Sequence, residues 1–147
     1  MSLFQSFNIN ASGMTAQRFR MDVISENVAN VNTTRTEDGS PYRRKVVSFA
    51  EKTVTPFSKV LNNTRESYMG NGVKVYSLKE DTESDFVMKY EPSHPDADEN
   101  GYVSYPNVNI VTEMTNMIDA SRAYEANVTA FQASKSMAIK GLEIGTK

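Results

Sequence analysis

Residues 23–33 read Val23-Ile24-Ser25-Glu26-Asn27-Val28-Ala29-Asn30-Val31-Asn32-Thr33. This stretch closes an N-terminal segment in which apolar residues recur every seven positions. That spacing is typical of an amphipathic helix with a coiled-coil-like stripe. Asparagine suits helix ends and turns better than helix interiors, because its side chain hydrogen-bonds nearby backbone. We therefore expect the first helix to end within this stretch, where Asn27, Asn30 and Asn32 interrupt the apolar pattern.

A second stripe with the same spacing lies at the other end of the chain. Asn109 is suited to cap the start of a helix there, and Gly141 or Gly145 is suited to end it. The two stripes can be buried against each other or against other copies of the chain. The methionines within them either fill a core or adapt the stripe to unlike neighbours. The expected assembly positions are Leu3, Phe7, Met14, Met21, Ile24, Val28, Val31, Ile110, Met114, Met117, Tyr124, Val128, Phe131 and Leu142.

The middle of the chain predicts short strands separated by turns, which Asp38-Gly39 and Asn100-Gly101 mark. The expected strands are residues 42–49, 72–78, 86–90 and 102–105, with mostly loop over 50–71. The predicted fold class is α+β. Two long terminal α-helices pack as a coiled-coil-like unit, and a small β-rich, loop-rich domain is inserted between them. The predicted boundaries are a discontinuous helical assembly domain, residues 1–32 and 108–147, and an inserted domain, residues 33–107.

Composition and charge argue against several classes of protein. The formal net charge is −2, from 16 basic and 18 acidic residues, so no nucleic-acid partner is expected. The cluster Arg43-Arg44-Lys45 is expected at a solvated strand or turn edge. The chain has no cysteine, which excludes disulfides and thiolate metal sites within it. No apolar run approaches the roughly 20 residues that cross a bilayer, so no membrane insertion is expected.

His94 is the only histidine of the chain, and Asp96, Asp98 and Glu99 follow it closely. The group could hold a metal or form an acid–base pair. However, no second histidine or cysteine completes a zinc site, and every neighbour lies in one proline-rich loop. The alternative is a structured turn, which we prefer. We expect no catalytic residues, no metal site and no cofactor.

Several stretches resemble the flagellar axial family, the rod and hook proteins. Residues 23–33 resemble the N-terminal signature of that family, with Asn27, Asn30, Asn32 and Thr33 as its characteristic positions. Residues 39–45, 90–98 and 101–109 are similar to the middle motifs of the proximal-rod member, and residues 113–114 and 121–127 are similar to its closing motif. The resemblance extends over nearly the whole chain.

The resemblance implies a structural protein that is not an enzyme. Members of this family are made in the cytoplasm and exported by the flagellar type III apparatus without a cleaved signal peptide. They polymerise into the hollow periplasmic rod of the basal body, which transmits torque. The implied partners are other copies, proximal and distal rod proteins, components of the basal-body base and the export apparatus.

Two other classes of function remain open from the residues alone. A stand-alone coiled-coil adaptor would form a closed dimer or trimer with ordered termini. A rod subunit would be a monomer with mobile ends or an open polymer. An enzyme is the third possibility, and His94 is the only residue that suggests catalysis.

Overall fold

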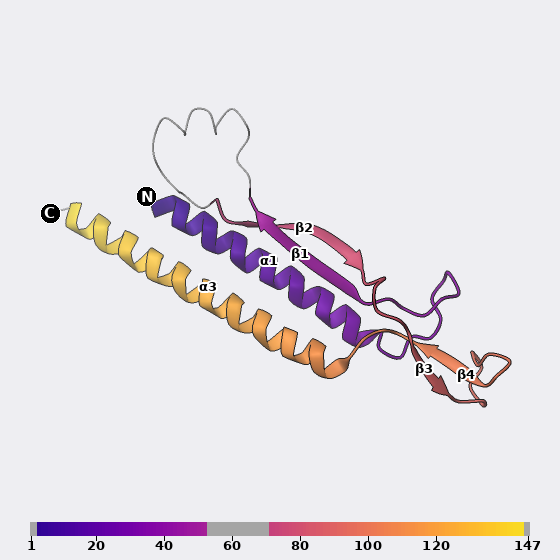
Figure 1. Ribbon diagram of the computed structural model, residues 1–147. Helices are drawn as coiled ribbons and strands as arrows, with labels where there is room; N and C mark the ends of the chain where they lie inside the picture. Colours follow the sequence, from indigo (N-terminus) through magenta and orange to yellow (C-terminus); the bar gives the residue numbers. More distant parts are fainter. Residues whose placement is uncertain (1–2, 53–70, 146–147) are drawn as a thin grey trace, which may run out of the picture. The chain divides into compact units, whose positions relative to one another are not determined.

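The fold consists of two long helices joined through a region of short strands. A computed structural model describes residues 3–52 and 71–145, with side chains from Gln5 onward. The elements in chain order are α1 (Leu3–Ala29), β1 (Lys45–Glu51), β2 (Val73–Glu80), β3 (Val87–Tyr90), β4 (Tyr102–Tyr105) and α3 (Ile110–Gly145) (Figure 1). The predicted α+β class, with a small strand region between long terminal helices, is confirmed.

The first helix ends within residues 23–33, as expected, but Asn27 does not help to end it. Asn27 was predicted to help end the helix, and this prediction is wrong. Its backbone lies inside the last helical turn and its side chain is buried. The helix ends at Ala29, and a turn follows in which the Thr33 amide donates to the Asn30 carbonyl at 3.0 Å. Tertiary hydrogen bonds, described below, outweigh the weak helix preference of Asn27.

The second helix begins and ends where the sequence indicated. Asn109 Oδ1 accepts hydrogen bonds from the backbone amides of Val111, at 3.0 Å, and Thr112, at 3.3 Å. These bonds satisfy two of the amides that a helix start leaves unpaired, so the predicted cap is confirmed. The helix ends at Gly145, one of the two glycines expected there.

The strands form two small sheets. β1 pairs with β2, and β3 pairs with β4. β3 and β4 are antiparallel, and their register places Val87 opposite Tyr105 and Tyr90 opposite Tyr102. The bounds of β4 agree with the prediction, whereas β1 begins at Lys45, three residues later than expected. Most of the predicted loop over residues 50–71 lies outside the described residues.

The two predicted turns are both present. Gly39 and Gly101 have φ values of 78° and 80°, a region that side chains with a Cβ rarely adopt. In the second turn, Asp98 Oδ1 accepts hydrogen bonds from the amides of Asn100, at 2.9 Å, and Tyr102, at 2.7 Å. The turn therefore sets the start of β4.

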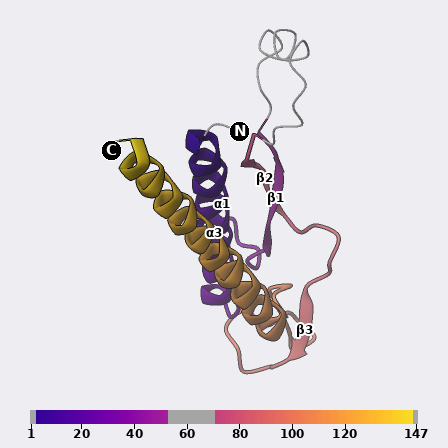
Figure 2. The ribbon, with the colours of Figure 1, turned by 90° about the vertical axis from the view of Figure 1, so that its left-hand side faces the viewer.

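The chain divides into two compact units, each of which takes part of both helices. Unit 1 comprises Met1–Phe19, Ser48–Tyr76 and Ala120–Lys147, and unit 2 comprises Arg20–Val47 and Ser77–Asp119. Within unit 1, Figures 1 and 2 show the first part of α1 side by side with the second part of α3. The division at residues 32 and 108, expected from the sequence, stays a prediction.

The units have cores of different character. The side chains that unit 1 buries among its described residues are small, namely Ala16, Ala120 and Ser134. Unit 2 buries larger apolar side chains together with two polar ones. Its buried residues include Val23, Ile24, Tyr42, Val103, Val108, Asn27 and Glu113.

Candidate assembly surface and its buried support

A buried polar cluster lies in unit 2, and Asn27 is at its centre. The side chain of Asn27 is 1% exposed. Its Nδ2 donates to the Lys45 carbonyl at 2.9 Å and to Glu113 Oε2 at 3.0 Å. Its Oδ1 accepts from the Tyr42 hydroxyl and from the Lys45 amide, both at 2.9 Å. All four hydrogen-bonding positions of the amide are satisfied, which ties the end of α1 to β1 and to the first turn of α3.

Glu113 is equally buried, and its charge is paired. Its Oε1 accepts hydrogen bonds from Arg44 Nε at 2.9 Å and Arg44 Nη2 at 2.8 Å, and from Asn116 Nδ2 at 3.3 Å. A buried carboxylate is costly unless a cation and further donors compensate it, as they do here. Its place in the first turn of α3 also puts the negative charge at the positive end of the helix dipole.

The basic cluster at residues 43–45 is not a solvated edge, so that expectation is wrong. Arg44 is 25% exposed because it turns inward to Glu113. Arg43 lies over the Phe86 ring, 4.3 Å from its centroid. Lys45 forms an ion pair with Glu26. Each of the three cations has a partner distant in sequence, and no local pattern signalled those partners.

Tyr42 is buried beside this cluster. Burial and the nearby carboxylates of Glu26, Glu80 and Glu113 raise the pKa of its phenol to about 12. The hydroxyl therefore keeps its proton at neutral pH and remains a donor to Asn27.

The other signature residues serve different purposes. Asn30 Nδ2 donates to the Glu26 carbonyl at 2.9 Å, and its Oδ1 accepts from Thr33 Oγ1 at 3.1 Å. These bonds close the turn that follows α1. Asn32 is exposed. Residues 23–33 thus contain one buried anchor, one turn-forming pair and one surface position.

The two helices run antiparallel in unit 1. The rings of Phe7 and Phe131 lie 5.0 Å apart, centroid to centroid. Farther along α1, a Cβ placed on Gly13 would come within 2.5 Å of Asn127 Oδ1, so the helices approach closely there. If the helices pair antiparallel within one chain, the two stripes predict that Met14 lies near Val128. Both observed contacts agree with that register to within about a turn.

The predicted assembly positions fall into three groups. Ile24 is buried, and nine others are half-buried: Phe7, Met14, Met21, Val28, Val31, Met117, Tyr124, Val128 and Phe131. Ile110, Met114 and Leu142 are exposed. The side chain of Leu3 lies outside the described ones. Stripe periodicity alone did not separate the positions that face the other helix from those that face solvent.

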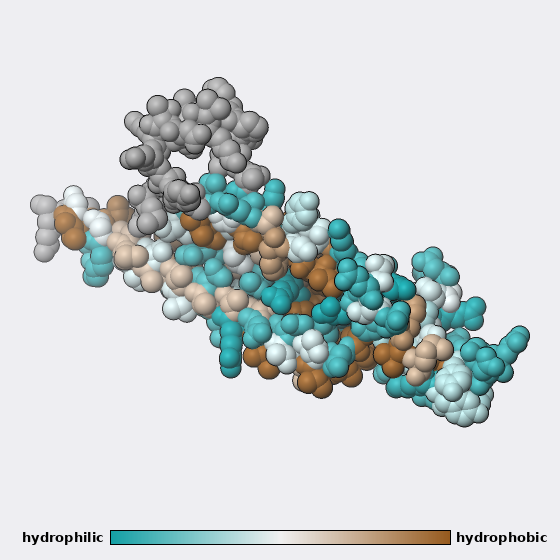
Figure 3. Space-filling model, in the orientation of Figure 1, coloured by the Kyte–Doolittle hydropathy of each residue, from teal (hydrophilic) through white to brown (hydrophobic). Residues whose placement is uncertain are grey.

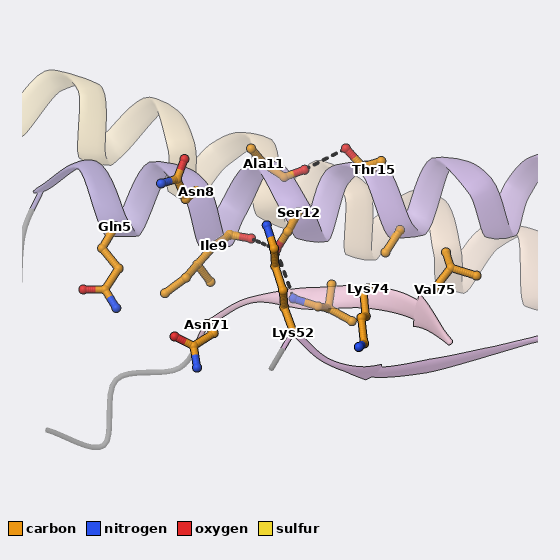
Figure 4. Close-up of a pocket in the computed structure, with 12 residues that line it drawn as sticks. Gln5, Asn8, Ile9, Ala11, Ser12, Thr15, Lys52, Asn71, Lys74 and Val75 are labelled. Carbon is orange, nitrogen blue, oxygen red and sulfur yellow. Dashed lines mark hydrogen bonds between the residues drawn. The ribbon is translucent and has the colours of Figure 1, made fainter. Parts of the chain in front are cut away.

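A cleft of about 810 Å³ lies in unit 1 beside the first part of α1 (Figure 4). Ser12 lines it, and its Oγ donates to the Ile9 carbonyl at 2.7 Å and accepts from the Val73 amide at 3.0 Å. Gly72 sits directly against this hydroxyl, since a Cβ there would lie 2.3 Å from Ser12 Oγ. The hydroxyl therefore joins α1 to the start of β2, which is a structural role.

The loop around His94 has the contacts of a structured turn. His94 Nδ1 accepts a hydrogen bond from the Asp96 amide at 3.1 Å, and the His94 carbonyl accepts one from the Ala97 amide at 3.1 Å. Within residues 3–52 and 71–145, no group of three or more histidine and carboxylate side chains is placed to hold a metal ion. Over the same residues, neither helix combines the length and the apolar content that crossing a membrane requires.

Two models of protein families match the ends of the chain that form the helices. Residues 7–35 match the family described as flagella basal body rod protein. Residues 99–144 match the C-terminal family described as flagellar basal body rod FlgEFG protein C-terminal. The long paired helices and these two matches define the class as the flagellar basal-body rod proteins.

Curated relatives identify the member of that class to which the chain is similar. The flagellar basal-body rod protein FlgC of Borreliella burgdorferi is 49% identical, over 98% of each chain. FlgC of Bacillus subtilis is 48% identical over 99% of each chain, and FlgC of Salmonella typhimurium is 38% identical over 99% of each. The chain therefore belongs to the FlgC family of flagellar basal-body rod proteins.

Proposed function

We propose that this chain is a non-catalytic subunit of the proximal rod, which polymerises through its terminal helices into the hollow periplasmic shaft that transmits torque. The observation that carries the proposal is the exposed apolar surface of α3. Leu142 and Ile144 are 71% and 79% exposed, and Ile110 and Met114 are also exposed. Large apolar side chains at such exposure are typical of surfaces that a partner covers.

The half-buried and exposed stripe residues have separate roles in this proposal. Half-buried residues such as Phe7 and Phe131 hold the helix pair together within one chain. Exposed residues such as Leu142 contact neighbouring subunits, and burial of each contributes about 1.5–3 kcal/mol. Contacts between unlike surfaces of identical chains extend into helical arrays when the rotation between neighbours does not close a ring.

Membership in the family supports a proposal for partners and location. The proposed partners are other copies, proximal and distal rod proteins and components of the basal-body base. The flagellar type III apparatus exports the chain from the cytoplasm, without a cleaved signal peptide. Mass spectrometry of the chain from isolated basal bodies tests the last point, because an intact N-terminal segment is expected.

The test of assembly replaces Leu142 with Asp in cells that lack their own copy of the protein. We expect the variant to be made and exported, but basal bodies to lack rods and the cells not to swim. Gln132→Asp is the matched control, since Gln132 is an exposed polar residue of the same helix. Normal rods with Leu142→Asp would contradict the proposed surface. A closed dimer or trimer of purified protein would favour an adaptor instead.

A further inference from the structure

Charge is distributed unequally between the two units. The residues of unit 2 include 14 acidic and seven basic side chains, a formal charge of −7. The described residues of unit 1 include six basic and three acidic side chains, a formal charge of +3. The overall charge of −2 therefore conceals two regions of opposite sign.

The opposite charges lie at the surface. All nine charged side chains counted in unit 1 are exposed, so its described surface carries a net +3: the basic ones are Arg18, Lys52, Lys74, Arg122, Lys135 and Lys140, and the acidic ones are Glu51, Glu125 and Glu143. Nine acidic side chains of unit 2 are exposed: Asp22, Glu37, Asp38, Glu80, Glu83, Asp85, Asp98, Glu99 and Asp119. The exposed basic side chains of unit 2 are Arg35, Lys79 and Lys89. Surface fields of opposite sign on one chain favour contact between the unlike regions of two copies.

The α3 helix presents exposed apolar residues in each of these charged regions. Its first part, in unit 2, exposes Ile110, Val111, Met114 and Ile118. Its second part, in unit 1, exposes Met137, Ile139, Leu142 and Ile144. Figure 3 shows hydrophobic patches over α3 both near its start and near its C-terminal end. Lys135 lies one helical turn before Ile139, on the same face.

We propose that the basic unit 1 of one copy docks against the acidic unit 2 of the next copy, with the two exposed apolar parts of α3 at the contact. This inference rests on the proposed function and specifies how two copies of the chain are oriented where they meet. The contact is heterologous, so each copy presents one surface of each kind and leaves one of each free for the next copy, unless a ring closes.

The charges favour a second copy of the same chain as the partner at this contact. Each copy carries both members of the complementary pair, so no other chain is needed to match them. Contact between two units 1 would juxtapose exposed lysines and arginines, and contact between two units 2 would juxtapose exposed carboxylates. Like-charge contacts oppose the wrong orientations, while apolar burial stabilises the correct one.

Two charge-reversed variants test the orientation. The first carries Arg122→Glu and Lys135→Glu, which changes the formal charge of the described residues of unit 1 from +3 to −1. The second carries Glu83→Lys and Asp119→Lys, which makes unit 2 less acidic. All four positions are exposed, so folding should be retained, and circular dichroism checks this. The matched control carries Arg122→Lys and Lys135→Arg, which preserves the sign of both charges.

Sedimentation of the purified full chain measures the association. For the unaltered protein, we expect the dissociation constant to rise about tenfold between about 0.03 M and about 0.3 M salt, because ions screen the contact. Each reversed variant should associate at least about tenfold more weakly than the control at low salt. An equal mixture of the two variants should recover association into 1:1 pairs, since the unaltered unit 1 of the second variant can dock against the unaltered unit 2 of the first.

The results separate this inference from the proposed function. Any of three results would overturn the charge-directed contact. The dissociation constant could stay the same as salt rises, the unaltered chain could stay monomeric at low salt, or the mixture of variants could fail to recover association. If the charge-reversed chains still build rods in cells while Leu142→Asp does not, the inference fails and the rod function stands. If Leu142→Asp also builds rods, the proposed assembly surface fails as well.

Discussion

Replacing Asn27 with alanine removes the centre of the buried polar cluster. Four hydrogen bonds are lost, two donated by Nδ2 and two accepted by Oδ1. Each contributes about 1 kcal/mol net, and the buried Tyr42 hydroxyl and Lys45 amide lose a partner. We expect the free energy of unfolding to fall by about 3–4 kcal/mol. For a chain of this size, the melting temperature should fall by roughly 6–15 °C.

Urea and thermal unfolding of the purified chain, followed by circular dichroism, measure this loss. Asn32→Ala is the control, because Asn32 belongs to the same signature but is exposed. It should change stability by less than about 0.5 kcal/mol. Asn27→Asp gives a second readout, since it places a carboxylate against the buried carboxylate of Glu113, and like charges repel there. A loss for Asn27→Ala no larger than for Asn32→Ala would refute the anchoring role of the cluster.

Three further results are expected from single substitutions. Folding raises the pKa of Tyr42 from 10.0 to about 12. The contribution of this phenol to stability is therefore complete below pH 10 and declines as pH rises towards 12. Tyr42→Phe should remove this decline from a profile of the free energy of unfolding against pH. Gly72→Ala should lower the free energy of unfolding, measured with urea, by more than about 2 kcal/mol, because φ is +86° and the new Cβ would meet Ser12. Gly39→Ala, at φ +78° but in open space, should lower it by about 1 kcal/mol. Gly141→Ala, inside α3 with open space around it, should raise the melting temperature through a gain of about 1 kcal/mol.

Features set by neighbouring residues could be predicted from the sequence. Asn109 caps α3 through amides two and three residues away, and β4 is bounded by a glycine turn and Pro106. Such signals are local, so periodicity and turn chemistry locate them. The same reasoning placed the two helices and their antiparallel register.

Features set by distant partners could not be predicted in this way. Asn27 was interpreted as a helix breaker because its preference was judged without Glu113, which lies 86 positions away. Arg44 was interpreted as solvated because its partner lies 69 positions away. The buried cluster is therefore the part of the structure that could not be predicted from the sequence, although Asn27 had been singled out as part of the asparagine signature.

The sequence separation of Asn27 and Glu113 also delays their contact during synthesis of the chain. A ribosome adds about 5–20 residues per second, so Glu113 is synthesised roughly 4–17 s after Asn27. Closing a loop of that length costs about 4 kcal/mol of chain entropy in addition to a length-independent term. The end of α1 therefore lacks its partner on α3 until most of the chain has been made. Until then, of the partners of Asn27, only Tyr42 and Lys45 are available to hold the end of α1.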